Sequence, residues 1–341
     1  MREAETGEPL RLKLLSLSPL LLSAVALSSV SQAALSFDIK RPEVRSFIDT
    51  MTRDHGFDKA KLEALLKSAD TKQPILDAIS RPAERVVPWH EYRDRFLTEK
   101  RIHQGADFWL AHGEKLKQIS DPALADAAVG ILGVETSYGR ITGKYKVLDA
   151  LVTLGFDYPP RGEFFLGELQ QFLLLSREEK VDPATVLGSY AGAMGAAQFI
   201  SSSYRKWAVD GDGDGHRDLW HSWDDVIGSV ANYLSEHGWV NGQPVVVTAT
   251  LDNPDLSRFD IKLALNETVQ SLRDKGVKFE TQLPPTAPAM LVVGEGKDGP
   301  VYRVGFNNFF VITRYNRSPM YAMAVHDLGE AIQNFMRDTE R

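Results

Sequence analysis

An acidic residue lies within the most apolar helical segment of this 341-residue chain. The segment DPALADAAVGILGVETSYGR begins with Asp121, a suitable N-cap, and Pro122, which suits the first turn of a helix. At helical spacing, one apolar stripe of the segment contains Leu124, Ala128, Ile131, Glu135 and Tyr138. The segment therefore predicts a buried helix that carries the carboxyl group of Glu135 on its apolar side.

Such a position is costly for a charged Glu135. The carboxyl group must be paired, hydrogen-bonded or kept protonated by desolvation, and the last state is that of a general acid that works near neutral pH. The alternative is a glutamate at a helix end, bonded to a backbone amide or to an arginine such as Arg140. The residues of this segment leave both interpretations open.

The first 33 residues are predicted to form a secretory signal rather than part of the fold. Arg2, Arg11 and Lys13 precede the apolar run LLSLSPLLLSAVALSSV, and the small-residue sequence Ser31-Gln32-Ala33 follows it. Cleavage after Ala33 would leave residues 34–341 as the mature chain. A retained membrane anchor is the alternative, which the proline, the serines and the short length of the run disfavour.

Composition excludes several classes of protein. The chain is 43% hydrophobic and 25% charged, which is typical of a globular protein with a substantial core. It contains no cysteine, which excludes disulfides and a lipidated N-terminal cysteine. Its net charge of -7 disfavours binding to nucleic acids or anionic membranes. We therefore expect a mature chain that is soluble outside the cytoplasm and binds no nucleic acid.

Helical patterns dominate the first two thirds of the chain. They cover residues 44–56, 58–70, a long segment at 90–117, and then 121–139, 161–177 and 224–237. Strand-forming residues follow at 245–251, 290–293 and 301–316, before a closing helix at 321–337. Residues 252–289 are rich in proline and form either a small appended lobe or a long functional loop.

The segment GSYAGAMGAAQFISSSYRKWA, residues 188–208, concentrates small side chains around Gln198. Small residues allow a ligand or another backbone to approach closely, and a buried Gln198 amide needs hydrogen-bond partners. The alternative is tight helix packing along a seam of small residues.

An acidic loop follows in VDGDGDGHRDLWHSWDD. Asp210, Asp212 and Asp214 alternate with glycines, as at positions 1, 3 and 5 of a calcium loop, and His216 offers its carbonyl at position 7. Position 12 is a histidine, so Asp224 or Asp225 must close a longer loop. We favour a bound divalent ion over a solvated acidic turn, because three acids in five residues would otherwise repel one another. Ca²⁺ is the best candidate, because the ligands are all oxygen atoms.

Aromatic and amide side chains gather in ITRYNRSPMYAMAV, which contains Tyr315, Asn316 and Tyr321. Sugar rings stack on aromatic faces, and amides bind their hydroxyl groups. Tyr92 in EYRDRF and Arg161 in FDYPPRGEFF are also side chains of a kind that can bind sugars. Ordinary core tyrosines are the alternative.

Together the segments GVETSYGR, AGAMGAAQF, the acidic loop, TRYN and YAMAV resemble the lytic murein transglycosylase B family, in the family's order along the chain. The resemblance covers the chain from about Phe37 to the last helix. It implies a mainly α (α+β) fold, with a lysozyme-like helical core, an extra helical region and a small β region.

The resemblance also implies roles for individual residues. Glu135 corresponds to the single catalytic acid and base of the family, and the elongated EF-hand-like calcium loop corresponds to residues 210–225. Within that loop the structural Ca²⁺ ligands are Asp210, Asp212, Asp214, the His216 carbonyl and Asp225, which we choose over Asp224 because it directly precedes the helix VIGSVANYL. The implied substrate contacts are Ser189, Gln198, Arg161, Tyr315, Asn316, Tyr321 and, as a weaker match, Tyr92.

The implied activity is cleavage of the MurNAc-GlcNAc β-1,4 bond of peptidoglycan without water, leaving a 1,6-anhydromuramoyl end. No organic cofactor is expected, and the expected partners are glycan strands and proteins of cell-wall synthesis or remodelling, with the chain itself a monomer. Two alternatives are a hydrolytic muramidase and a non-catalytic, calcium-stabilised protein that binds peptidoglycan. The chain departs from the best-known members of the family, which are lipoproteins, because it has no cysteine for an anchor.

Overall fold

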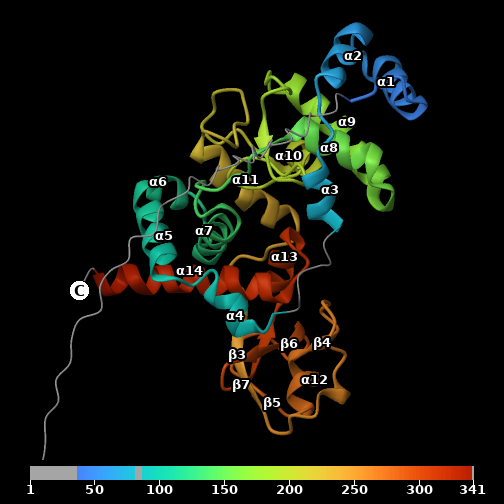
Figure 1. The fold of residues 1–341 in the computed structure, drawn as a ribbon. Helices are drawn as coiled ribbons and strands as arrows, with labels where there is room; N and C mark the ends of the chain where they lie inside the picture. The colour runs from blue at the N-terminus through green and yellow to red at the C-terminus, as the bar shows by residue number, and fades with distance from the viewer. Residues whose placement is uncertain (1–36, 81–86, 340–341) are drawn as a thin grey trace, which may run out of the picture. The chain divides into compact units, whose positions relative to one another are not determined.

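A computed structural model describes residues 37–80 and 87–339. Within it, α7 (Pro122–Thr136) is buried along most of its length and packs against α14 (Pro319–Thr339) and α5 (Glu99–Ala111) (Figure 1). The helices α7 and α14 approach closely at Gly130, where a Cβ atom would lie 2.3 Å from the carbonyl oxygen of Val325. The predicted cap is confirmed, since Asp121 accepts a hydrogen bond from the backbone of Ala123 at 3.0 Å.

The predicted extent of this helix was wrong at its C-terminal end. Ser137, Tyr138 and Gly139 have φ angles of 49°, 59° and 75°, so three successive residues adopt the left-handed conformation directly after α7. The amide of Tyr138 bonds back to the carbonyl of Leu132 at 3.0 Å, as in a helix-ending turn. Tyr138 therefore leaves the helical stripe, and Glu135 occupies the last turn of the helix.

The N-terminal helices are α1 (Pro42–His55), α2 (Lys59–Lys67) and α3 (Gln73–Ser80), and α3 contacts α8. The long helical segment expected at 90–117 is divided into α4 (Trp89–Asp94), α5 and α6 (Gly113–Leu116). The division has a local cause, because the Thr98 side chain caps α5 by accepting from the backbone of Arg101 at 3.2 Å.

The middle of the chain is helical with short extended pieces. A two-stranded ribbon pairs β1 (Tyr145–Lys146) with β2 (Leu187–Gly188). The helical elements are α8 (Val147–Asp157), the 3₁₀ turn η1 (Pro159–Arg161), α9 (Gly162–Glu178), α10 (Ser201–Trp207) and α11 (Trp223–Glu236).

Residues 188–200 do not form a helix, so the helix-seam interpretation of this small-residue segment was wrong. Gly192 and Gly195 have φ angles of 80° and 66°, and the segment turns back so that Met194 bridges both Gly188 and Phe199. These glycines allow the backbone to turn. At Gly195 a side chain would also clash, because a Cβ atom would lie 2.3 Å from the carbonyl oxygen of Leu219.

The later third contains an antiparallel sheet in the order β4-β6-β7-β3-β5, grouped with α12 in Figure 1. The elements are β3 (Val246–Leu251), η2 (Leu256–Arg258), β4 (Glu267–Thr268), α12 (Val269–Asp274), β5 (Val277–Lys278), β6 (Pro288–Gly296) and β7 (Gly299–Gly305). This sheet has its own buried cluster, which includes Phe259, Leu272 and Val304. Residues 252–289 are therefore part of a small lobe rather than a long loop.

The strand expected at 301–316 is only partly present. β7 ends at Gly305, and residues Asn307–Tyr315 form the helix α13. Phe309, Val311 and Ile312 are buried on this helix, so packing overrides the strand preference of aromatic and β-branched residues. The closing helix is confirmed as α14.

The predicted signal segment, residues 1–33, lies outside the described residues. Among the described residues, no helix combines the length and apolar character needed to cross a membrane.

Candidate active site

A pocket of about 480 Å³ opens beside the C-terminal end of α7. Glu135 is the only carboxyl group among the described residues that line it. The other lining residues come from the 189–203 segment, from α11 and from the end of α13; they are Ser189, Tyr190, Ala191, Ala193, Gln198, Phe199, Ile200, Ser203, Tyr233, Arg314, Tyr315 and Asn316. The pocket thus combines one acid with amides, hydroxyl groups and aromatic rings.

Burial raises the pKa of Glu135 from its usual value to about 7. The phenol of Tyr321 donates a hydrogen bond to Glu135 Oε1 at 2.8 Å, which acts in the opposite direction because it stabilises the carboxylate. Arg140 does not pair with Glu135, since its guanidinium donates to the carbonyl of Ser137 at 3.0 Å. Glu135 can therefore exchange a proton near neutral pH.

Replacing Tyr321 with Phe tests this arrangement. The variant loses the hydrogen bond that lowers the pKa of Glu135, so the pKa rises further above 7. In the parent, activity that needs protonated Glu135 declines about tenfold per pH unit above its pKa. We expect the alkaline limb of the kcat/KM profile to move to higher pH in Tyr321→Phe. A limb at unchanged or lower pH would show that Tyr321 does not tune this acid.

Thr136 holds the end of α7 against the 189–203 segment. Its side chain is 1% exposed, donates to the carbonyl of Ala196 at 2.9 Å and accepts from the backbone of Gly139 at 2.9 Å. One hydroxyl group thus joins the helix end, the left-handed turn and the wall of the pocket.

We expect Thr136→Val to lower the free energy of unfolding by about 1–3 kcal/mol, because both partners of the hydroxyl group lose their hydrogen bonds in a buried place. Thr136→Ser keeps the hydroxyl group and serves as the matched control. Urea denaturation of the three proteins measures the difference. Equal stability of the valine variant and the parent would contradict the bridging role.

The structure brings together most of the predicted substrate contacts. Ser189, Gln198, Tyr315 and Asn316 line the pocket, and Tyr321 bonds to Glu135. Backbone groups orient two of these side chains: the Ser189 hydroxyl accepts from the backbone of Ala193, and the Gln198 amide donates to the Thr142 and Gly195 carbonyls at 3.0 Å and 2.9 Å.

Two predicted contacts do not line the pocket. Arg161 precedes α9, and its guanidinium lies 4.3 Å from the ring centre of Phe164. Tyr92 on α4 stacks on Trp89 and lies near enough to Tyr321 to contribute to the raised pKa of that phenol, which burial dominates. Tyr92 thus lies near the tyrosine that bonds to the acid, and the substrate roles of Tyr92 and Arg161 stay predictions.

Sequence reasoning missed Tyr233 on α11, which lines the pocket. Its phenol donates to the carbonyl of Arg314 at 2.7 Å, and its ring contacts that of Tyr315 with centres 4.9 Å apart. Tyr233 falls on the apolar face of an amphipathic helix, so the sequence offered no sign that it reaches a pocket.

The nearby acids that could have supplied a second catalytic carboxylate are used elsewhere. Asp149 is 3% exposed and accepts from the backbone of Asp70 at 3.1 Å. Glu168 is 6% exposed and accepts from the Ser202 backbone and hydroxyl group at 2.9 Å and 2.6 Å. Both are structural acids, and neither lines the pocket.

The acidic loop brings three carboxyl groups together. Oxygen atoms of Asp210, Asp212 and Asp214 lie within 4.8 Å of one another, and all three residues are exposed. An all-oxygen set of this kind fits a hard cation such as Ca²⁺. A second cluster, His326, Asp327 and Glu330, is less suited, because Asp327 makes a two-pronged ion pair with Arg303.

Asp225 organises the acidic loop. It is 1% exposed, and its two oxygens accept from the backbone amides of Gly211 at 2.7 Å and Asp218 at 2.6 Å. Asp225 is not among the three clustered carboxyl groups. Its predicted role as the closing ligand stays a prediction.

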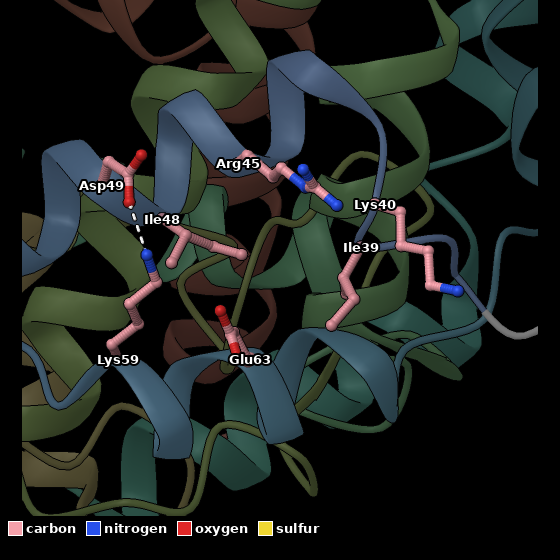
Figure 2. A pocket seen from close by; sticks show the side chains of 7 residues that line it. All are labelled: Ile39, Lys40, Arg45, Ile48, Asp49, Lys59 and Glu63. Carbon is pink, nitrogen blue, oxygen red and sulfur yellow. Dashed lines mark hydrogen bonds and ion pairs between the residues drawn. The ribbon is translucent and has the colours of Figure 1, made fainter.

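A different pocket, of about 470 Å³, lies beside α1 and α2 (Figure 2). Figure 2 shows charged side chains around it, with Lys59 paired to Asp49 at 2.9 Å. This ion pair lowers the pKa of Asp49, opposite to the shift of Glu135. The pocket contains none of the predicted site residues, so we assign it no catalytic role.

Comparison with known proteins identifies the family. Residues 40–330 match the family model described as the transglycosylase SLT domain. The chain belongs to this family. It is 41% identical over 303 residues to membrane-bound lytic murein transglycosylase B of Escherichia coli (strain K12), a match that covers 85% of this chain and 82% of that protein. The chain is therefore a lytic murein transglycosylase, an enzyme that acts on peptidoglycan.

Solved structures of other transglycosylases share the fold. Soluble lytic transglycosylase SltB1 of Pseudomonas aeruginosa is 48% identical with a TM-score of 0.83, covering 86% of this chain and 99% of that one. Escherichia coli lytic transglycosylase Slt35 in complex with calcium is 39% identical with a TM-score of 0.80, covering 88% and 96%. The predicted mainly helical, lysozyme-like fold with a small β region is confirmed.

Proposed function

We propose that this transglycosylase cleaves the β-1,4 bond between N-acetylmuramic acid and N-acetylglucosamine without water, and that Glu135 is its sole acid and base. The observation that carries the proposal is the pocket with one carboxyl group, whose pKa of about 7 suits proton transfer in both directions. The name of the Escherichia coli relative supports the substrate, peptidoglycan.

A lone carboxyl group constrains the mechanism. Glycosidases that hydrolyse their substrate generally use two carboxyl groups, about 5–5.5 Å apart when retaining and about 6.5–9.5 Å apart when inverting. Among the described residues that line this pocket, Glu135 has no such partner. We therefore propose that the substrate provides the nucleophile, and the muramoyl C6 hydroxyl group is the one that can close a ring on C1.

In the proposed sequence, protonated Glu135 donates its proton to the glycosidic oxygen, and the bond from that oxygen to muramoyl C1 breaks. The acetamido group of the same sugar stabilises the oxocarbenium-like centre. The ionised Glu135 then accepts the proton of the C6 hydroxyl group as its oxygen bonds to C1. The product is a 1,6-anhydromuramoyl end, and Glu135 returns to its protonated state.

The walls of the pocket are suited to hold sugar rings. Ser189, Gln198 and Asn316 offer hydroxyl and amide groups, and the ring of Tyr315 offers an aromatic face. A Pseudomonas aeruginosa transglycosylase, SltB3, has been solved in complex with NAG-anhNAM-pentapeptide; it is 30% identical, with a TM-score of 0.74, and the match covers 85% of this chain and 79% of that one. That complex supports the assignment of an anhydro sugar as product.

We propose that the loop at residues 210–225 binds Ca²⁺ through Asp210, Asp212, Asp214 and the His216 carbonyl, with Asp225 completing or supporting the site. The ion would neutralise three close carboxylates and stabilise the loop, and it takes no part in the reaction. The calcium complex of Slt35 supports this proposal. We also propose a periplasmic location, consistent with the signal segment predicted in residues 1–33.

Purified peptidoglycan and the fragment 34–341 test the enzymatic proposal. We expect the fragment to solubilise muropeptides and to create few new reducing ends, because the anhydro ring occupies C1. Release accompanied by an equal number of reducing ends would identify a hydrolytic muramidase. Binding without release would identify a non-catalytic wall-binding protein, and either result contradicts the proposal.

A further inference from the structure

A cluster of basic residues lies on the loop that follows the left-handed turn. Arg140, Lys144 and Lys146 are exposed, and the sequence from Ser137 to Leu148 contains no acidic residue. Residues 183–200, which face this loop, carry no charge at all. The loop therefore places three positive charges together in a chain whose net charge is -7.

None of these three cations makes an ion pair within the part of the chain that the structure describes. The guanidinium of Arg140 donates to a backbone carbonyl, that of Ser137, and the ammonium of Lys144 lies 6.0 Å from the ring centre of Tyr145. Arg314, which lines the pocket, adds a further cation. These charges are available to an anion from solution.

The loop is fixed to the edge of the active-site pocket. The Gln198 amide donates to the carbonyl of Thr142 at 3.0 Å, and β1 pairs with β2, setting Lys146 opposite Leu187. The contact is so close at Gly143 that a Cβ atom there would lie 2.0 Å from the carbonyl oxygen of Gly188. The basic loop is therefore a continuation of the pocket wall.

Exposed apolar side chains accompany the charges. Ile141 is 68% exposed, Leu187 48% and Tyr190 39%, and Tyr190 also lines the pocket. Large apolar side chains exposed together beside a site indicate a binding surface. Cations beside apolar groups suit a ligand that carries both carboxylates and methyl groups.

We propose that this loop, Arg140–Lys146 with Leu187 and Tyr190, binds the stem peptide of the muramoyl residue being cleaved. The proposal rests on the proposed function, which puts a muramoyl sugar beside Glu135. The stem peptide leaves that sugar at the lactyl group, carries carboxylates, and contains alanine methyl groups for the apolar positions. A bare glycan strand has free lactyl carboxylates but nothing to cover the exposed apolar side chains.

The test compares the parent with Lys144→Glu/Lys146→Glu on two substrates: uncrosslinked glycan strands with intact stem peptides, and the same strands after an amidase has removed the peptides. We expect KM for the intact strands to rise about tenfold in low salt, with kcat unchanged, because two weak attractions become repulsions. Added salt should reduce the difference. On amidase-treated strands, which keep only the lactyl carboxylate, the rise in KM should be clearly smaller.

Two further variants control for folding and net charge. Lys144→Arg/Lys146→Arg should retain the parent KM, and Lys61→Glu/Lys67→Glu changes the net charge equally on exposed positions of α2. Unchanged KM in the Lys144→Glu/Lys146→Glu protein, or an equal rise on both substrates, would overturn the stem-peptide assignment. If the parent released no muropeptides, the proposed function itself would fail, which is a distinct result.

Discussion

Glu135→Gln is expected to lower kcat by three or more orders of magnitude, because a sole acid and base has no substitute in the pocket. The fold should persist. Since burial raises the pKa of Glu135 to about 7, its contribution to stability is present below pH 4.5 and is lost as the pH rises through 7. The neutral glutamine avoids this loss, so at pH 8 the variant should melt at or above the parent Tm.

Glu168→Gln provides a matched control for this substitution. Glu168 is also buried, but it bonds to Ser202 and lies outside the pocket lining. We expect the control to lower Tm and to keep the parent kcat, the reverse of Glu135→Gln. Release of muropeptides and thermal melting of both variants measure the two effects. Retention of a tenth or more of the parent kcat in Glu135→Gln would show that another group supplies the proton.

Calcium is expected to have the largest effect on stability. An ion that binds only the folded chain at a hundred times its Kd stabilises it by about 2.7 kcal/mol. For the folded unit at residues 34–341, that corresponds to a rise in Tm of roughly 4 °C. Melting curves in excess calcium and in excess chelator measure the shift. An identical Tm in both would show that the loop binds no calcium under these conditions.

The acidic loop also supplies the control for this experiment. In Asp212→Asn/Asp214→Asn the clustered charge falls, so the calcium-dependent rise in Tm should be lost. The variant's own melting curve in chelator is the reference, because Asp212 and Asp214 also accept hydrogen bonds from the Ser222 hydroxyl and the His216 amide. A variant that still responded to calcium like the parent would place the ion elsewhere.

Sequence reasoning succeeded where local chemistry decides the structure. Asp121 and Pro122 marked the start of α7, and the amphipathic pattern identified α14. Glu135 stood out because a charged carboxyl group is costly on the apolar stripe of a helix. Its raised pKa allows the group to be protonated there near neutral pH. For the acidic loop, the spacing of three aspartates was enough to expect the cluster that the structure contains.

The failures arise where distant parts of the chain decide the outcome. Strand-forming residues such as Phe309 and Ile312 lie on a helix because both are buried there. Tyr138 lies in a left-handed turn after the helix rather than in the helix. The sequence offered no sign of this turn at residues 137 and 138, because neither residue is a glycine. The role of Arg161 stays a prediction, because its guanidinium packs on Phe164 and it is not among the residues that line the pocket.

The arrangement of the pocket links these observations to chemistry. The last turn of α7 presents Glu135, and the following left-handed turn leads directly into the loop that borders the pocket. Thr136 joins both to the 189–203 segment. The short segment around Glu135 is thus held by several hydrogen bonds. Among the described residues that line the pocket, there is no second carboxylate of the kind that hydrolysis generally requires.

Mass spectrometry of the muropeptides released from purified peptidoglycan tests the central claim most directly, with the fragment 34–341 and its Glu135→Gln variant run side by side. The account predicts anhydromuramoyl products from the parent and none from the variant. Products heavier by one water would contradict the intramolecular transfer, and anhydromuramoyl products from the variant would contradict the role of Glu135.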